Sequence, residues 1–415
     1  MDLLVANARV WDDRPLVNVA MENGLIAEIG TDVTPAAARV IDVEGRAVLP
    51  AFLEPHLHLD KALLYRRQPA RDGTLEEAIR LTGLLKAVQE EADVLDRSRT
   101  VLDMALRNGT VGVRAQPDVD PIQGLIGVTT GLTLREEYRE LLDLQIVAFP
   151  QEGIIKSAGT YELMQEAMRL GADVVGGCPY NEPDWETTQQ HIDMVFELAQ
   201  RFEAPVDMHA DFADDTSDPR YTAASYIAQR TIELGYQGRV TLGHVTSLGA
   251  LTPEEAKPVV DLLAEADISI VTLPATDIYL GGRKDRSNQR RGLTPTHLLR
   301  DAGVNVACAS NNVRNAFTPF GKADPLQIAS LLAHVGQFGT PHSQVEVLRM
   351  STYDAARAMG IADGYGIGVG RRADLVVLDS QLVADVLLDL PPRRYVIRRG
   401  RVAVETRSEC VIHRG

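Results

Sequence analysis

The sequence contains little cysteine, no excess of positive charge and no long apolar run. Its three cysteines, Cys178, Cys308 and Cys410, stand far apart and form no Cys-x-x-Cys pair. The spacing therefore predicts neither a disulfide framework nor a thiolate zinc site. We interpret the three thiols as small apolar residues and expect them to be buried.

The charge balance and the hydropathy exclude two classes of partner. The formal net charge of −16 argues against a nucleic-acid or anionic-membrane binder, because phosphate groups are held by clustered cations. No apolar stretch is long enough to cross a bilayer, and the segment Met1 to Ala6 lacks the basic start and apolar run of a signal peptide. We expect a cytoplasmic protein that takes a small-molecule substrate, has no nucleic-acid or membrane partner, and forms a homo-oligomer.

The length and the residue patterns predict two structural units. A chain of 415 residues with 45% hydrophobic content can bury one large core and one smaller core. Short alternating runs near both chain ends, such as Gly24 to Gly30 and Arg394 to Val404, are typical of small antiparallel strands. We predict that residues 1–50 and 362–415 form one composite β-sandwich and that residues 51–361 form the larger domain.

The middle of the chain alternates short apolar runs with helical patterns, such as those at Thr74 to Glu91 and His191 to Phe202. This alternation builds a parallel sheet with helices outside it. A count of eight apolar runs favours an α/β fold of the closed (β/α)8 type, the TIM barrel, over an open sheet. The runs are Ala51 to His58, Thr110 to Ala115, Leu144 to Phe149, Ala172 to Gly176, Pro205 to His209, Val240 to His244, Ile268 to Leu273 and Val304 to Ala309.

Polar side chains stand where six of these strands end. In (β/α)8 barrels the active site lies at the carboxyl ends of the strands, so we expect these side chains to converge on one opening. They are His56 and His58, Gln116 and Asp118, Gln151, His209 and Asp211, His244, and Asn311.

The most specific local pattern is His56-Leu57-His58. Residues two apart on a strand share a face, so both imidazoles point to the same side. A bare His-x-His pair is more often two ordinary histidines than a metal site. Here the pair ends an apolar strand, and His209 and His244 end two later strands. The pattern therefore predicts one divalent metal ion, with zinc favoured and iron or manganese as alternatives.

Longer stretches around these residues resemble the amidohydrolase superfamily, and within it the cytosine deaminase branch that includes N-isopropylammelide hydrolase-type enzymes. The resemblance covers nearly the whole chain and implies a metal-bearing (β/α)8 barrel with a split β-sandwich. It also implies that His56, His58 and His209 are metal ligands, that His244 lies beside the metal-bound water, and that Gln151 binds the substrate ring. The stretches are Glu54 to Lys61, Val147 to Ile154, Val206 to Asp211, Val240 to Thr246, Gly282 to Arg283, Arg290 to Gly292, Pro319 to Gly321 and Gly370 to Val376.

Two positions depart from the family pattern. Phe212 replaces the Glu that shuttles protons in these deaminases, and Asn311 replaces the nearly universal Asp that binds the metal and accepts a proton from water. Cytosine is therefore disfavoured as the substrate. An ion held by three neutral imidazoles can still ionise water near neutral pH. Asn311 is either natural or an engineered change made to trap a ligand.

A proton donor for the leaving group has to come from elsewhere, and we favour Asp211 over Asp214 and Asp215. If the strand continues past His209, Asp211 shares the inward face of that ligand, whereas the other two belong to a following loop. Asp214 and Asp215 could equally belong to a solvated loop or cap a helix.

Several further residues are expected at the opening of the barrel. We assign Lys61, Phe212 and Asn312 to the substrate pocket beside Gln151. The basic segments at 283–286 and 290–291 either bind an anionic substrate group or anchor loops through ion pairs.

The leading hypothesis is a metal-dependent hydrolase that acts on a C–N bond of a small cyclic nitrogen compound. In it His244, Asp211 and Asn311 act at the reacting atoms. The alternative is a catalytically silent member that binds a ligand.

Overall fold

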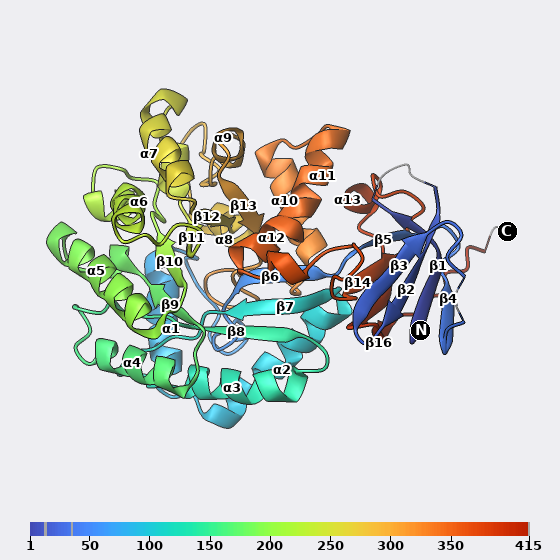
Figure 1. Ribbon diagram of the computed structural model, residues 1–415. Coiled ribbons are helices and arrows are strands. Elements are labelled where there is room, and N and C mark those ends of the chain that lie inside the picture. Colours follow the sequence, from blue (N-terminus) through green and yellow to red (C-terminus); the bar gives the residue numbers. More distant parts are fainter. Residues whose placement is uncertain (12–14, 35, 414–415) are drawn as a thin grey trace.

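A computed structural model describes residues 1–11, 15–34 and 36–413 of the chain. It contains one sheet of eight parallel strands surrounded by helices and a second sheet of eight strands formed by both chain ends. Figure 1 shows the helix-covered sheet on one side and the second sheet, which carries both termini, on the other.

The parallel sheet forms a nearly closed barrel, and all eight strands expected from the sequence are present. Its strands follow one another in chain order, each parallel to the next. The seam between the first and the last strand is joined by backbone bonds: His58 N donates to Asn311 O (2.8 Å) and Asn311 N donates to His56 O (3.1 Å). The strands are β6 (Phe52–Leu57), β7 (Thr110–Ala115), β8 (Asp143–Ala148), β9 (Val174–Gly177), β10 (Val206–Ala210), β11 (Val240–His244), β12 (Ser269–Thr272) and β13 (Asn305–Cys308).

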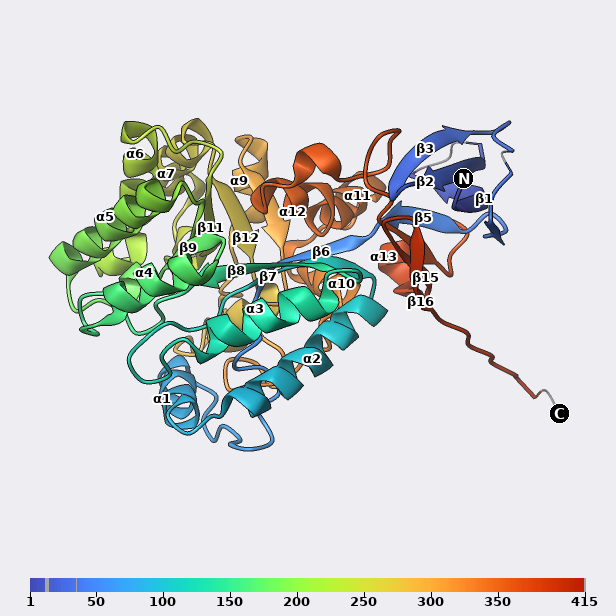
Figure 2. The ribbon, with the colours of Figure 1, turned by 60° about the horizontal axis from the view of Figure 1, so that its bottom comes forward.

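Helices cover the outside of the barrel, as Figures 1 and 2 show. Two of them differ from the sequence prediction. The expected helix over 74–91 ends at Lys86, and a new helix begins at Glu91; the expected helix over 191–202 begins earlier, at Trp185, because Asp184 and Thr187 form a capping box there. The helices are α1 (Leu75–Lys86), α2 (Glu91–Arg107), α3 (Ile126–Tyr138), α4 (Thr160–Leu170), α5 (Trp185–Phe202), α6 (Ala224–Glu233), α7 (Pro253–Glu265), α8 (Pro274–Leu280), α9 (Thr296–Asp301), α10 (Pro325–Gly336), α11 (Pro341–Met350) and α12 (Tyr353–Ala358).

The second sheet joins the two ends of the chain. Antiparallel pairing of β14 with β5 places Leu375 opposite Pro50 and Val377 opposite Val48. Apolar side chains from both ends share one core, which includes Val5, Met21 and Ile397. The strands are β1 (Leu3–Val10), β2 (Val17–Glu22), β3 (Leu25–Gly30), β4 (Arg39–Asp42), β5 (Ala47–Pro50), β14 (Leu375–Leu378), β15 (Arg393–Arg398) and β16 (Arg401–Glu405), and α13 (Val386–Asp389) lies between β14 and β15. The expected domain boundaries remain a prediction.

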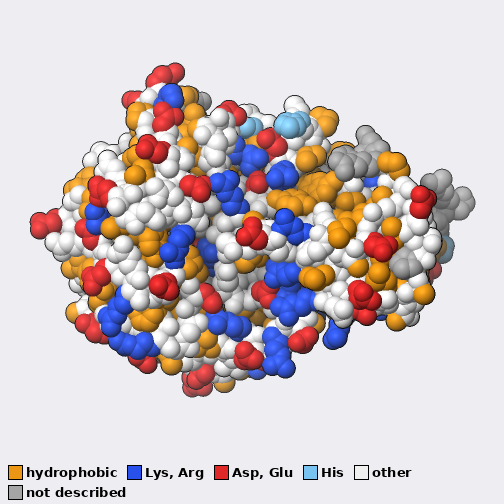
Figure 3. All heavy atoms as spheres, in the orientation of Figure 1, with side chains coloured by type: hydrophobic (Ala, Val, Ile, Leu, Met, Phe, Trp, Pro, Cys, Tyr) orange, Lys and Arg blue, Asp and Glu red, His pale blue; other side chains and the backbone are white. Residues whose placement is uncertain are grey.

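The surface carries both signs of charge. On the face shown in Figure 3, acidic and basic side chains are interspersed with apolar ones. None of the helices in the described residues is long and apolar enough to cross a membrane.

Candidate active site

Three histidines from opposite sides of the barrel meet at the carboxyl ends of its strands. Nε2 of His209, on β10, lies 3.0 Å from Nε2 of His56 and 3.1 Å from Nε2 of His58, both at the end of β6. All three side chains are buried. Nitrogen ligands about 2.0–2.1 Å from a tetrahedral ion lie roughly 3.3 Å apart, so this spacing fits a single shared metal ion. The structure thus brings the three predicted ligands together.

The three rings are neutral and ready to bind a cation. Burial lowers the pKa of His56, His58 and His209 well below the usual histidine value, and the neighbouring imidazoles add to this effect. For His58 the tautomer follows from its partner, because the carbonyl oxygen of Gln116, 2.8 Å from Nδ1, can only accept a hydrogen bond. Nδ1 therefore carries the hydrogen and Nε2 keeps its lone pair for a metal.

Asn311 lies beside His56 and His58, at the carboxyl end of β6. Its backbone pairs with His56 and His58 across the barrel seam, with a left-handed φ of 59°. Its side chain lines the same cavity as His58 and His209. The Oδ1 atom is buried and has no hydrogen-bond partner in the part of the chain that the structure describes. A buried carbonyl oxygen without a donor is costly, and a cation beside it would satisfy it.

His244, the last residue of β11, lies beside the triad, and its ring is hydrogen-bonded to a buried carboxylate. Its ring centroid lies 5.3 Å from that of His209. Nδ1 donates to Oδ1 of Asp277 across 2.6 Å, and Asp277 is completely buried on α8. Asp277 was not expected from the sequence, because it stands four residues beyond the apolar run of the seventh strand, in a helix.

The cavity in front of the histidines is small and has one apolar wall. The space between its walls, including the part that is open to solvent, is about 380 Å³. Phe212, which is 7% exposed, packs its ring 4.4 Å from that of His244 and belongs to an apolar cluster with Leu280 and Phe317. Of the described residues that line the cavity, none is a carboxylate; they are His58, Lys61, Leu75, Ile79, Gln151, Tyr180, His209, Phe212, His244, Thr276, Asn311, Asn312 and Phe317.

Lys61 and Gln151 lie together on the polar side of this cavity. Nζ of Lys61 donates to Oδ1 of Asp118 (2.6 Å) and to Oε1 of Gln151 (3.4 Å). Burial opposes ionisation of Asp118, but Lys61 and Lys86 hold the pKa of this carboxyl below its usual value. The cavity therefore offers a fixed ammonium group and an amide to a polar substrate edge.

Asn312 also lines the cavity, but its amide is already engaged within the protein. Its Nδ2 donates to Oγ1 of Thr276 (3.3 Å), and its Oδ1 accepts from Nδ2 of Asn315 (2.7 Å). The side chain is therefore held in one orientation at the edge of the cavity.

The expected position of Asp211 was wrong. Strand β10 ends at Ala210, and Asp211 has a left-handed φ of 52°, so its side chain leaves the inward face. Its Oδ1 accepts from Ala223 N (2.7 Å) and its Oδ2 from Ala224 N (3.1 Å), at the first turn of α6. A carboxylate at a helix N-terminus completes free N–H groups and complements the helix dipole. Asp211 is thus a structural cap and does not line the cavity.

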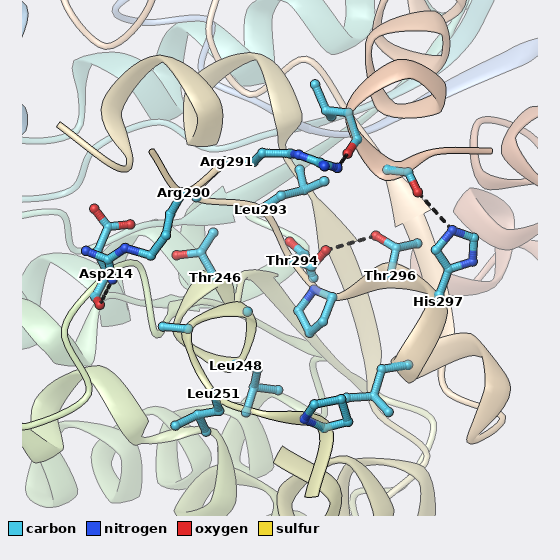
Figure 4. Close-up of a pocket in the computed structure, with 18 residues that line it drawn as sticks. Asp214, Thr246, Leu248, Leu251, Arg290, Arg291, Leu293, Thr294, Thr296 and His297 are labelled. Carbon is cyan, nitrogen blue, oxygen red and sulfur yellow. Dashed lines mark hydrogen bonds between the residues drawn. The ribbon is translucent and has the colours of Figure 1, made fainter. Parts of the chain in front are cut away.

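The basic segment at 290–291 anchors loops. Arg290 donates to both oxygens of Asp285 (2.9 Å each) and to the carbonyl oxygen of Asp214, while Arg291 donates to the carbonyl oxygen of Val335. Figure 4 shows Arg290 and Arg291 among the residues that line a second, wider pocket. Leu248, Leu251 and Leu293 give this pocket an apolar lining, and it holds no cluster of metal-binding groups among the described residues.

Comparisons with known proteins agree with this geometry. The sequence model described as "Amidohydrolase family" matches residues 39–404. A crystal structure of 5-methylcytosine deaminase from Klebsiella pneumoniae is similar over 99% of each chain, with a TM-score of 0.93 and 31% identity. N-isopropylammelide isopropyl amidohydrolase from Pseudomonas sp. (strain ADP) is 27% identical over 97% of each chain. Pterin deaminase from Rhizobium rhizogenes (strain K84 / ATCC BAA-868) is 30% identical over 93% of this chain and 87% of that protein.

Proposed function

Because the chain belongs to the amidohydrolase family, we propose that it hydrolyses a C–N bond of a small cyclic nitrogen compound, with water as the nucleophile. The observation that carries the proposal is the position of the His209 Nε2 atom, which lies within hydrogen-bond distance of Nε2 of both His56 and His58. Neutral lone pairs this close repel one another unless a cation lies between them. The relatives named above act, by their names, on compounds of this class.

A divalent ion bound by the three imidazoles would polarise the substrate and make water acidic enough to react near neutral pH. Asn311 would offer it a neutral oxygen in place of a carboxylate, so the positive charge of the site would be only weakly compensated. We favour zinc, which three neutral imidazoles suit, over iron or manganese. One ion is proposed because the triad provides a single set of ligands.

The remaining residues of the cavity bind and orient the substrate. Gln151 and Lys61 face a polar edge of the ring, and Asn312 presents its fixed amide beside Thr276. Phe212 and Phe317 form the apolar wall. Cytosine is a poor candidate, because Phe212 offers no hydrogen bond to a ring nitrogen or to a departing ammonia molecule. A cyclic amide, an amidine or a heterocycle with a substituted amine fits better.

The second candidate is a silent member that binds such a compound without turnover. It is favoured by one observation, the lack of any carboxylate among the described residues that line the cavity. We also keep the expectations that the chain forms a homo-oligomer and resides in the cytoplasm as predictions.

The test is metal analysis followed by a substrate screen. Purified protein should retain about one equivalent of a divalent ion, and His209→Gln should lose it. The loaded protein is then incubated with 5-methylcytosine, pterin, N-isopropylammelide and simple cyclic amides and amidines, while release of ammonia or amine is measured. Turnover lost in His209→Gln supports the hydrolase. Ligand-induced thermal stabilisation without turnover favours the silent candidate, and a protein that binds no metal ion contradicts the hydrolase.

A further inference from the structure

Asp277 is a buried carboxylate that contacts His244, a histidine that lines the cavity beside the metal triad. It lies on α8, which begins at Pro274 directly after β12, and its side chain is completely buried. Oδ1 accepts from Nδ1 of His244 (2.6 Å), and Oδ2 accepts from the backbone N–H of Leu273 (3.2 Å). Both carboxylate oxygens are therefore fixed, and the His244 ring is fixed with them.

The geometry decides which nitrogen of His244 is free. The Nδ1 hydrogen points at Asp277, so Nε2 keeps its lone pair on the other side of the ring. His244 also has a left-handed φ of 73°, and its carbonyl oxygen accepts from Oγ1 of Thr294 (2.6 Å). The ring lies between Phe212 (4.4 Å) and His209 (5.3 Å) and lines the cavity. Within the pair of His244 and Asp277, Nε2 of His244 is therefore the nitrogen that remains available to a substrate in the cavity.

Other lining groups are poorly suited to exchange protons. Lys61 is held by Asp118 and Gln151. Burial raises the pKa of Tyr180 well above its usual value. His58 and His209 belong to the triad, and the positions that would carry a shuttle and a base hold Phe212 and Asn311. Among the described lining groups, His244 is the remaining one with a ring nitrogen that its own hydrogen bonds leave free.

We propose that Asp277 is a positioning residue that lets His244 carry the proton from water to the leaving nitrogen. This inference rests on the proposed hydrolysis. As the water oxygen bonds to the substrate carbon, one proton passes to Nε2 of His244, and the negative charge of Asp277 stabilises the resulting imidazolium. The proton then passes from Nε2 to the departing nitrogen as the C–N bond breaks with its electron pair on nitrogen. The second proton of water stays with the oxo product, so atoms and charge balance without a redox partner.

A carboxylate–histidine pair with a purely structural role should affect stability but not the chemical step. The chain contains such a pair, which serves as a matched control. Glu182 and His191 form a second completely buried carboxylate–histidine pair (2.7 Å), and neither residue lines the cavity. Breaking either pair should lower thermal stability. Only the His244 pair should change the chemical step.

The experiment compares Asp277→Asn, Asp277→Glu and Glu182→Gln in the metal-loaded enzyme, with the best substrate of the screen. We expect Asp277→Asn to lower kcat by about 10²- to 10⁴-fold with KM and metal content nearly unchanged. Asp277→Glu should recover part of the loss, and Glu182→Gln should keep kcat. A kcat for Asp277→Asn within about threefold of the wild type (~0.7 kcal/mol) would overturn the proposal.

A second measurement, by NMR, tests the hydrogen bond between Asp277 and His244 without the need for turnover. In protein labelled with ¹⁵N-histidine, the Nδ1–H signal of His244 should lie far downfield and disappear in both Asp277→Asn and His244→Gln. If the wild type instead carries its hydrogen on Nε2, the proposal fails even when a substrate is found. If the Nδ1–H signal is present and no compound is turned over, the hydrolytic function fails while the positioning by Asp277 is supported.

Discussion

Nζ of Lys61 donates to Oδ1 of Asp118 across 2.6 Å, and both side chains are almost completely buried. Asp118 also accepts from Lys86 (3.3 Å), which in turn pairs with Asp120 and Glu152. The charges at the polar side of the cavity are thus held in one connected network. Removing a single member leaves a buried charge with one partner fewer.

Lys61→Met should therefore be strongly destabilising. We expect the free energy of unfolding to fall by about 3–5 kcal/mol, because Asp118 is buried and loses its nearest cation. Urea denaturation measures the change. As a control, Lys257→Met removes an exposed pair with Asp261 and should cost no more than about 0.5 kcal/mol. Equal effects of the two changes would contradict this account of the network.

Asn311→Asp should strengthen metal binding. A carboxylate at this position adds a negative ligand charge where the native side chain has only a neutral oxygen, so the dissociation constant for zinc should fall by about tenfold or more. Competition with a chromophoric chelator measures it. Asn311→Leu serves as the comparison, since it removes the oxygen without adding charge, and it should bind zinc more weakly than the wild type. Unchanged affinity in both variants would show that position 311 does not contact the ion.

The turnover of Asn311→Asp separates two explanations of the native residue. A large gain in hydrolysis would show that the amide disables an otherwise ordinary site. A loss would show that the site is tuned to a neutral ligand at this position.

Asp211→Ala should lower stability and leave metal content unchanged. The substitution frees the backbone N–H groups of Ala223 and Ala224, and an unpaired buried donor costs about 1–3 kcal/mol. Asp215→Ala, at an exposed position in the same loop, should change stability by less than about 0.5 kcal/mol. Loss of the bound ion in Asp211→Ala, measured by metal analysis, would argue against a purely structural role.

The thiols should differ sharply in reactivity. Burial raises the pKa of Cys178 and of Cys308 to about 12, so both remain protonated and shielded at neutral pH. Cys410 is exposed, contrary to the expectation that all three are buried. Titration with a thiol reagent at pH 8 should give one fast group in the native protein and three after denaturation. A second fast thiol in the native protein would contradict the packing around Cys178 or Cys308.

The barrel could be predicted from the sequence because parallel strands buried on both faces appear as uninterrupted apolar runs. The metal triad could be predicted because His56, His58 and His209 lie within the last residues of such runs. The break between α1 and α2 could not, since residues 87–90 contain neither glycine nor proline. Local sequence gives no signal for that turn.

The sequence prediction erred in opposite ways for two carboxylates: it placed Asp211 in the active site, and it missed Asp277. The prediction for Asp211 assumed that the strand continues, and a single left-handed residue turned its side chain away. Asp277 was missed because its position depends on the first turn of a helix after β12, where no alternating pattern applies. In both cases the direction of a side chain is set by backbone dihedral angles that the residue types do not reveal.

The pairing of β5 with β14 has a consequence for how the chain is made. During synthesis the first five strands leave the ribosome long before their partner near residue 375 exists. Throughout translation of the barrel, one edge of β5 therefore exposes unpaired backbone groups that could join a neighbouring nascent chain. Strand β14 closes this edge only after the barrel has been translated. A product truncated before β14 would therefore keep an unpaired edge on β5 and be prone to aggregate.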